Sequence, residues 1–273
     1  MGGFCDGCDC VILSETAVCQ LTKTLDGTMR LLAEGARQLG ISLDEAQLRL
    51  FQTYYEALIA WNQRVNLTSI TDYEEVQTKH FLDSLSAIWA LRHAGASPEW
   101  ADDAWAPRVI DVGSGTGCPG IPLKIAWPSL QLTLLEATRK KAEFLQTLVR
   151  QLRFAHVKVI AARAEEVAHQ LEHRETYDLA VARAVARLPT LAELTLPLVR
   201  VGGMVLAYKG EDPGGELDVA QRAITCMGGQ VRQVLPIKIP GLMAARHLVL
   251  LDKMSSTPDA YPRRPGLPAK RPL

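Results

Sequence analysis

The sequence predicts an α/β fold in which a mostly parallel, seven-stranded sheet carries helices on both faces and follows a small helical subdomain. Three observations support this prediction. Short apolar runs alternate with helical stretches from residue 108 onward, which is the pattern of βαβ units. A glycine-rich segment, GSGTGCPG, follows the first of these runs. Residues 29–91, before it, show helical periodicity alone.

Composition narrows the class of protein. The chain has 273 residues, 30 basic and 30 acidic, and 48% of them are hydrophobic. These values exclude a disordered tail protein, a collagen-like repeat and a small disulfide scaffold. No uncharged apolar run approaches the ~20 residues of a membrane span, and the first residues do not resemble a secretory signal. We therefore expect a soluble cytoplasmic protein that is not anchored in a membrane.

Residues 1–28 hold four of the six cysteines, namely Cys5, Cys8, Cys10 and Cys19. The spacing of Cys5 and Cys8 occurs in zinc sites, but no second CxxC or HxxxH follows. The segment also lacks clear periodicity. We expect a flexible leader, or a start assigned upstream of the true one, and no metal site.

The helical subdomain is expected over residues 29–100. Ser42 and Glu45 have the spacing of a capping box, with Ser42 as N-cap. One apolar face follows at helical spacing, formed by Leu48, Phe51, Tyr55 and Leu58. A second helix is expected from Asp72, carrying Val76, Leu82, Leu85 and Trp89, and a polar, proline-containing segment ends it.

The main domain is expected over residues 101–254. The predicted strands are 108–112, 131–135, 157–160, 177–182, 203–208, 230–235 and 246–251. The predicted helices between them are 119–127, 139–153, 164–172, 189–200 and 214–227. Only a short connection separates the last two strands, which favours an antiparallel pair. Residues 255–273 form a basic, proline-rich tail that should be extended rather than helical.

The glycine-rich segment predicts a ligand site. Gly113, Gly115, Gly117 and Gly120 lie between a strand and a helix, where a ligand approaches the backbone and free N–H groups. Two ligands fit. The last three glycines match the dinucleotide fingerprint, whereas Asp111 with Gly113, Gly115 and Gly117 has the pattern of S-adenosylmethionine (SAM) methyltransferases, where the aspartate attracts the cationic methionine end of the cofactor.

Two further acidic positions fit a nucleoside ligand. Glu136 ends the second strand, where a carboxylate accepts hydrogen bonds from both ribose hydroxyls. The third strand leads to Ala164 and Glu165, the position of adenine contacts in methyltransferases of this architecture. Glu136 could equally cap the next helix, and Glu165 could be a solvated residue of a first helical turn.

The fourth and fifth strands end in cations, Arg183 and Lys209, with Arg187 one turn beyond Arg183. No [DN]-P-P-[YFW] loop for exocyclic amines is present, and neither Cys118 nor Cys226 suits the nucleophile of a C5 methyltransferase. Cations at the carboxyl ends of strands line the crevice of such a sheet and suit a polyanionic substrate. Ion pairs with nearby acids are the alternative interpretation.

With these residues in place, the sequence resembles the bacterial small-subunit ribosomal RNA guanine-N7 methyltransferases, also called glucose-inhibited division protein B. The resemblance runs from about Met29 to Leu273. Its motifs are Trp61-Asn62-x-x-x-Asn66-Leu67-Thr68, His80-Phe81-Leu82-Asp83-Ser84, the loop DVGSGTGxPGIP, the segments ARA, YKG and RHLV, and the tail YPRRPGxPxKxPL. It implies a Rossmann-like, SAM-dependent enzyme that acts on 16S rRNA.

The resemblance also implies site residues. Gly113 and Cys118 should lie on the cofactor, with Glu136, Ala137 and Thr138 toward its ribose and adenine, and Ala164 and Glu165 at the adenine. Arg183 should lie near the site of methyl transfer, and we expect Arg183 and Lys209 to be the catalytic residues. The sequence departs from the family in two places: relatives often carry Phe or Leu at Cys118, and the cysteine-rich leader has no counterpart.

The implied chemistry needs no general base, because N7 of guanine carries an in-plane lone pair at neutral pH. We expect Arg183 to position the guanine or an adjacent phosphate. Other cations should hold the RNA backbone, namely Lys209, Arg139–Lys141, Arg246, Arg263 and Arg264. His80, Asp83 and Asn66 should brace the helical subdomain against the cofactor loop. The partner is expected to be 16S rRNA or a precursor of the small ribosomal subunit, bound by a monomer.

Three other functions fit parts of the sequence. A nicotinamide-dependent oxidoreductase shares the glycine loop and the acid at the strand end. A non-catalytic RNA-binding protein would explain the basic tail but not the cofactor motifs. A SAM-dependent methyltransferase of another RNA or of a small molecule also fits, because one sequence does not show the substrate.

Overall fold

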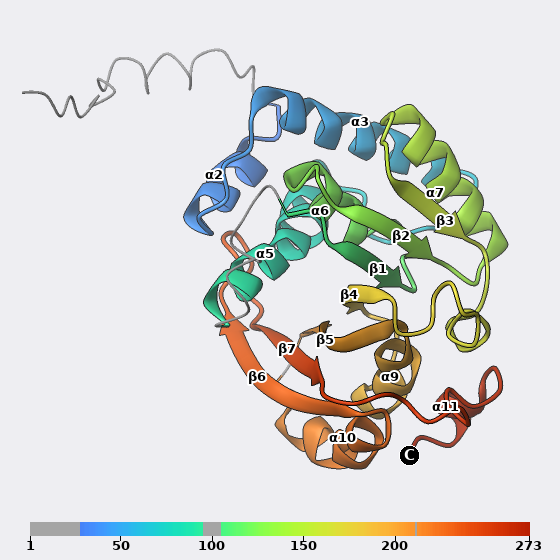
Figure 1. Ribbon diagram of the computed structural model, residues 1–273. Helices are drawn as coiled ribbons and strands as arrows, with labels where there is room; N and C mark the ends of the chain where they lie inside the picture. Colours follow the sequence, from blue (N-terminus) through green and yellow to red (C-terminus); the bar gives the residue numbers. More distant parts are fainter. Residues whose placement is uncertain (1–27, 95–104, 211) are drawn as a thin grey trace, which may run out of the picture.

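The computed structural model describes residues 28–94, 105–210 and 212–273, so the predicted leader lies outside the described residues apart from Thr28. A seven-stranded sheet forms the centre, with strand order β3-β2-β1-β4-β5-β7-β6 (Figure 1). The strands are β1 (Arg108–Val112), β2 (Gln131–Leu135), β3 (Val157–Ile160), β4 (Tyr177–Arg183), β5 (Val199–Lys209), β6 (Gly229–Ile237) and β7 (Arg246–Lys253). The first five are parallel, and β7 pairs antiparallel with both β5 and β6. The predicted topology is confirmed.

Helices connect the strands on both faces. They are α6 (Gly120–Ala126), α7 (Arg139–Gln151), α8 (Ala164–Val167), α9 (Leu188–Thr195) and α10 (Gly214–Cys226). Two predicted helices were too long. The helix predicted at 164–172 ends at Val167, and the Arg174 side chain donates to the Ala168 carbonyl just beyond that end. The helix predicted at 189–200 gives way to a 3₁₀ turn, Leu196–Leu198, because Pro197 lacks an N–H and β5 begins at Val199.

The amino-terminal part of the described chain is helical, as predicted. It comprises α2 (Arg30–Gln38), α3 (Glu45–Asn62), α4 (Tyr73–Glu75), the π-helical η1 (Val76–Leu82) and α5 (Asp83–His93). The predicted capping box is shifted by two residues. Asp44 rather than Ser42 caps α3, because its carboxylate accepts the Gln47 N–H at 2.7 Å while Gln47 accepts the Asp44 N–H at 2.8 Å.

One residue of the predicted apolar face of α3 is also corrected. Tyr54 is fully buried, whereas Tyr55 is half-buried and packs edge-on against Tyr73 with ring centroids 4.8 Å apart. Both tyrosines satisfy helical spacing from Phe51 and Leu58. Tyr54 lies at the centre of the stripe, which places its hydroxyl beneath the glycine loop.

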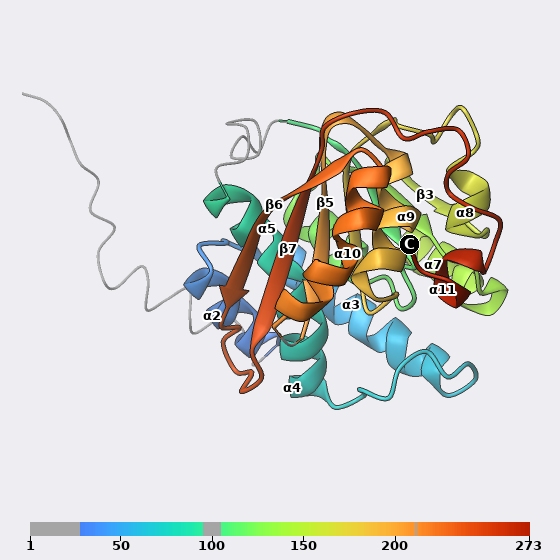
Figure 2. The ribbon, with the colours of Figure 1, turned by 90° about the horizontal axis from the view of Figure 1, so that it is seen from below.

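The core has two parts, one on each face of the sheet. Alternate residues of the strands point to opposite faces, so Val109 and Val181 pack with α2, α3, α5, α6 and α7, while Ile110 and Ala182 pack with α8, α9 and α10. Figure 2 shows α5 on one side of the strands and α9 with α10 on the other. The helical segment therefore shares one continuous apolar core with the sheet.

The carboxyl-terminal residues return across the face that carries α8 and α9. Arg263 forms a bidentate ion pair with Glu193, whose side chain is fully buried, at 2.7 Å for the shorter contact. The tail is not wholly extended as predicted, because a short helix α11 (Leu267–Lys270) follows the left-handed Gly266 and packs on α9 (Figure 1). Within the described ranges, no helix is both long and apolar enough to cross a membrane.

Candidate functional site

The glycine loop lies at the carboxyl end of β1, beside β4. The strand order reverses here, because β2 and β3 lie on one side of β1 while β4 and β5 lie on the other. In open α/β sheets such a switch point holds the ligand. The loop begins at Gly113, whose N–H donates to the Leu135 carbonyl at 2.8 Å. It ends at Gly120, where α6 begins. The predicted ligand loop is therefore at the position where a ligand is expected.

The glycines of the loop serve different purposes. Gly113, Gly115 and Gly117 have φ values of 72°, 56° and 96°, a left-handed conformation that other residues rarely adopt. A Cβ atom on Gly117 would lie 2.9 Å from the Tyr54 hydroxyl, so this position is closed by packing. A Cβ atom on Gly115 would meet nothing closer than the Gly113 carbonyl at 3.8 Å. The open side of the loop is thus at Gly115.

Asp111 is fully buried beneath the loop. One carboxylate oxygen, Oδ2, accepts the Gly120 N–H at 2.9 Å, and the other, Oδ1, has no partner among the described residues. Burial raises the pKa of Asp111 to about 7, although the Gly120 N–H and the Arg183 charge act in the opposite direction. A partly protonated, under-satisfied carboxyl group next to a backbone loop is suited to a nearby positive charge, which would favour its ionised form.

Glu136 closes the loop from the neighbouring strand. Its Oε2 accepts the Gly115 N–H at 2.9 Å, and its Oε1 accepts the Thr138 N–H at 2.6 Å. Thr138 is the N-cap residue of α7, so Glu136 orders the backbone just before that helix and does not accept from the N–H groups of its first turn. Each oxygen retains a further acceptor lone pair. Ala137 and Thr138 are exposed at this rim.

Ala164 and Glu165, at the start of α8, are both buried. The Glu165 carboxylate accepts the N–H of Gly266, from the carboxyl-terminal tail, at 2.8 Å. Glu165 is thus not the solvated residue that local sequence allowed. The tail instead lies against the residues predicted to contact adenine.

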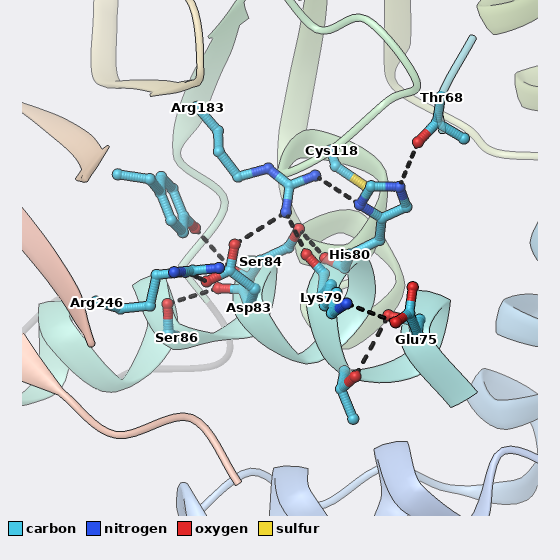
Figure 3. A network of polar contacts seen from close by, with 12 residues as sticks. Thr68, Glu75, Lys79, His80, Asp83, Ser84, Ser86, Cys118, Arg183 and Arg246 are labelled. Carbon is cyan, nitrogen blue, oxygen red and sulfur yellow. Dashed lines mark hydrogen bonds and ion pairs between the residues drawn. The ribbon is translucent and has the colours of Figure 1, made fainter. Parts of the chain in front are cut away.

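Arg183 ends β4 and points toward the helical segment, not into solvent (Figure 3). Its Nη1 donates to the Asp83 carboxylate and to the Lys79 carbonyl, each at 2.9 Å. Its Nη2 lies 3.3 Å from Nδ1 of His80. Burial on its own lowers the pKa of Arg183, but the neighbouring Cys118 thiol and the Asp83 carboxylate outweigh it and raise the pKa. Arg183 is permanently charged and held on three sides.

The Asp83 carboxylate binds arginines from two strands of the sheet. Its Oδ1 also accepts from Nε of Arg246, at the start of β7, at 3.2 Å. Two guanidinium groups therefore share one carboxylate, and the cluster retains one net positive charge. Arg246, expected at the RNA backbone, is committed to this internal pair.

His80 is a neutral partner in the same cluster. Burial, followed by the charge of Arg183, lowers the pKa of His80 to about 4. Its Nδ1 is then the acceptor toward Arg183, and its Nε2 donates to the Thr68 hydroxyl at 3.0 Å. This weak base is oriented by hydrogen bonds at both ring nitrogens.

The loop after α3 positions Thr68, and among the described residues its hydrogen bonds are made by Asn62 and not by Asn66. Asn62 accepts the N–H groups of Leu67 and Thr68 at 2.8 Å and 3.0 Å and donates to the Thr68 carbonyl at 3.0 Å. Asn66, which we expected to brace the subdomain, is exposed. Asn62 instead orders this loop, because its hydrogen bonds stay within residues 62–68.

Cys118 is buried beside Arg183 and the helical segment. Its Sγ lies 3.3 Å from the Tyr54 hydroxyl, which donates to the Thr116 carbonyl at 2.6 Å. Sequence reasoning missed Tyr54, which fastens the glycine loop to α3. Among the described residues, no group of three or more His, Cys, Asp or Glu side chains is placed to hold a metal ion.

Lys209 does not meet Arg183. Tyr208 pairs with Arg183 across the sheet and shares its face, so Lys209, the next residue, points to the opposite face. There its Nζ lies 3.0 Å from Glu216, and Arg187 lies 3.8 Å from the same carboxylate. The two predicted catalytic cations thus belong to separate clusters, each containing an acid.

Comparisons with known proteins place the chain in one family. The family model for rRNA small subunit methyltransferase G (GidB) matches residues 47–249. A relative named ribosomal RNA small subunit methyltransferase G, from Dehalococcoides mccartyi strain CBDB1, is 49% identical over 90% of this chain and 100% of its own. Relatives of the same name from Roseiflexus castenholzii and Moorella thermoacetica are 49% and 45% identical, covering 87% and 89% of this chain and 97% and 98% of theirs. A solved structure described as a predicted O-methyltransferase from Agrobacterium tumefaciens aligns with a TM-score of 0.46 at 20% identity, over 66% of this chain and 82% of that one.

Proposed function

This chain belongs to the rRNA small subunit methyltransferase G family, and we propose that it transfers a methyl group from S-adenosylmethionine to N7 of a guanine in 16S rRNA. The family match carries the proposal, because it spans the glycine loop, Glu136 and Arg183 together. The nicotinamide-dependent oxidoreductase and the non-catalytic RNA-binding protein do not account for that match. The family name does not specify N7 of guanine as the methylated atom. That assignment rests on the chemistry of the site.

The residues around the loop fit S-adenosylmethionine. The backbone of Gly115 faces open space, and Glu136 beside it keeps lone pairs for ribose hydroxyls. The buried Asp111, with an unused Oδ1 and a pKa near 7, suits the cationic methionine end. Gly113 and Cys118 belong to the same loop, and Ala137, Thr138, Ala164 and Glu165 border the adenosine side. When bound, the cofactor supplies an electrophilic methyl group on a sulfonium.

The acceptor atom follows from the two acid–base side chains that contact Arg183, neither of which is free to take a proton. His80 has a pKa of about 4 and already accepts from Arg183, and Asp83 is occupied by two arginines. An acceptor that must lose a proton would be poorly served by these groups. Guanine N7 needs no deprotonation, so alignment and electrostatics supply the catalysis.

Arg183 is the proposed catalytic residue. Its three internal contacts fix the guanidinium without neutralising the cluster, since Asp83 balances only one of Arg183 and Arg246. A fixed cation there would orient the guanine or an adjacent phosphate. Lys209 and Arg187 similarly share Glu216, and we assign Lys209 a role in holding the RNA on the other side of the crevice.

We also propose a role for the helical subdomain and for the carboxyl-terminal tail. Residues 29–94 supply Asp83, His80 and Tyr54, so the helical subdomain fixes Arg183 and the glycine loop. The tail beyond residue 254 closes the adenine side through Gly266. We propose that the enzyme acts as a monomer in the cytoplasm, on 16S rRNA or a precursor of the small ribosomal subunit.

Tritium transfer from labelled S-adenosylmethionine to RNA by the purified full chain tests the proposal. We expect label in 16S rRNA that cleaves at N7-methylguanine after borohydride and aniline treatment. Label in RNA without such cleavage would disprove the N7 assignment. Label absent from all RNA would favour a small-molecule methyltransferase.

A further inference from the structure

Besides the carboxyl-terminal tail, a second segment of the chain carries an excess of basic residues. Between residues 137 and 163 there is a single acidic residue, Glu143, against seven basic ones, whereas the whole chain has 30 basic and 30 acidic residues. The seven are Arg139, Lys140, Lys141, Arg150, Arg153, Lys158 and Arg163. The rest of the chain holds 23 basic and 29 acidic residues, so the positive charge of this segment should attract a polyanion.

These cations lie on α7, on β3 and in the segments that follow each of them, and we call the surface of these elements the α7–β3 surface. Helix α7 packs against β3, the edge strand of the sheet (Figure 1). Six of the seven basic residues are exposed, and Lys141 is half-buried. The surface begins at Arg139, next to Thr138 of the proposed cofactor site, and runs the ~20 Å length of α7 toward the amino ends of the strands.

At its far end the surface reaches a groove of about 270 Å³ at the amino ends of the strands. Arg108, His156 and Lys158 line the groove. The Arg108 guanidinium lies 5.3 Å above the centre of the Tyr177 ring. Both ends of the α7–β3 surface therefore present cations.

The cations of this surface differ from three other cations that were expected at the RNA. Arg246 and Arg263 each pair with a carboxylate inside the molecule, and Lys209 shares the Glu216 carboxylate with Arg187. On the α7–β3 surface, Arg139 pairs with Glu143, and no carboxylate within the described parts of the chain pairs with the other six. Their charge remains available to a ligand.

The surface also lacks the apolar centre of a protein interface. The large hydrophobic side chains that are exposed in the described residues lie on other elements, namely Leu171, Val201, Val219, Met243 and Met254. Positively charged, polar surfaces are typical of nucleic-acid interfaces. An acidic protein partner is thus less consistent with the surface than RNA.

We infer that the α7–β3 surface binds the phosphate backbone of the 16S rRNA segment that extends from the methylated guanine. This inference rests on the proposed function and adds the path of the RNA: away from the tail, along α7 and toward the groove at Arg108. Binding there is electrostatic, so it sets the affinity for RNA and not the chemical step.

Two triple variants of the full chain test the inference. The first replaces Arg150, Arg153 and Lys158 by alanine. The control also replaces two arginines and one lysine, all exposed and away from this surface: Arg37 of α2, Arg222 of α10, and Lys238, which follows β6. The probe is an in vitro transcript of 16S rRNA. Its dissociation constant is measured between 50 and 300 mM salt, and methylation kinetics are measured on the same transcript.

We expect the first variant to lower the slope of log K against log salt by about 2, because each lost phosphate contact removes about 0.7 to 0.9. Affinity at 0.1 M salt then falls on the order of 100-fold. KM for RNA should rise while kcat at saturating RNA and affinity for S-adenosylmethionine stay unchanged. The control variant should keep the wild-type slope.

Equal slopes for the first variant and the wild type would overturn the inference, as would an equal loss in the control. A wild-type protein that binds the transcript through this surface but transfers no methyl group would contradict the proposed function and leave the surface assignment intact. Wild-type protein that methylates the transcript with a flat salt dependence would contradict the surface assignment alone.

Discussion

The Asp83 carboxylate holds the guanidinium of Arg183 at 2.9 Å, although the two residues are 100 positions apart. Asp83 begins α5 in the helical segment, and Arg183 ends β4 of the sheet. The helical segment therefore does more than cover one face of the sheet. It sets the position of the arginine that faces the methyl-transfer site in our proposal.

Replacing Asp83 by asparagine should reduce both stability and catalysis. The variant leaves two guanidinium groups without their shared carboxylate, and breaking a buried pair of this kind costs about 3 to 5 kcal/mol of unfolding free energy. We expect kcat to fall while affinity for S-adenosylmethionine changes little. Urea unfolding and single-turnover methylation measure the two effects.

Glu75→Gln is the matched control for Asp83→Asn. It removes the surface pair with Lys79 from the same stretch of helix, and exposed pairs contribute about 0 to 1 kcal/mol. If both variants lose similar activity, the loss reports a general disturbance of the helix, and Asp83 does not position Arg183.

The tail should contribute to stability through Arg263. We expected Arg263 at the RNA backbone, but it pairs with the fully buried Glu193. Arg263→Ala leaves that carboxylate uncompensated, so we expect a loss of about 3 to 5 kcal/mol in unfolding free energy. The exposed neighbour Arg264 provides the comparison, because Arg264→Ala should change stability by less than about 0.5 kcal/mol. Equal losses would contradict the assignment.

Affinity for S-adenosylmethionine should depend on the ionisation of Asp111. Burial raises its pKa to about 7, and a bound cation favours the charged form. Binding below pH 7 therefore releases a proton, and affinity rises with pH up to about 7 and then levels off. Asp111→Asn should weaken binding and remove this rise. Calorimetric titrations from pH 5.5 to 8.5 test it, and wild-type affinity that is flat over this range would refute the role.

Asp111 and His80 should act in opposite directions on stability. Asp111 has a raised pKa, so the folded state binds more protons between about pH 3.8 and 7, and Asp111 lowers stability as pH rises through that window. His80 has a pKa lowered from 6.5 to about 4, so its contribution rises with pH over that window and is complete above 6.5. Unfolding of Asp111→Asn and His80→Gln across pH 4 to 8 should show slope changes of opposite sign. Changes of the same sign would contradict this account.

Two glycines of the loop should respond differently to alanine. Gly115→Ala adds a methyl group toward open space, at a cost of about 1 to 2 kcal/mol for the left-handed backbone, and should weaken S-adenosylmethionine binding at least tenfold. Gly117→Ala drives a methyl group to 2.9 Å from the Tyr54 hydroxyl, so it should destabilise the fold more than Gly115→Ala. Thermal unfolding and calorimetry separate the two. Equal cofactor affinity in Gly115→Ala and the wild type would exclude a ligand at that position.

Much of the fold could be predicted, because each strand from Arg108 onward is a short apolar run bounded by turn residues. The errors in the predicted elements arose where two nearby residues could fill the same role. Asp44 displaced Ser42 as helix cap because Gln47 was in range to reciprocate. Tyr54 displaced Tyr55 in the core because both satisfy the helical period.

The site was predictable where its chemistry is local. The glycine loop and Glu136 are recognisable from spacing alone, and the structure brings them into contact through the Gly115 N–H. Charge partners were not predictable, because they come from distant positions. Glu193 lies 70 residues from Arg263, and Asp83 lies 163 residues from Arg246. Sequence shows that a residue is basic but not whether its charge is already balanced.

The most direct test compares N7-methylguanine in 16S rRNA after reaction with the wild type and with Arg183→Ala, each loaded with S-adenosylmethionine. We expect one cleavable guanine with the wild type and none with Arg183→Ala, whose cofactor affinity should fall at most several-fold. A wild-type reaction that leaves every 16S rRNA guanine uncleaved, or full methylation by Arg183→Ala, would contradict the account.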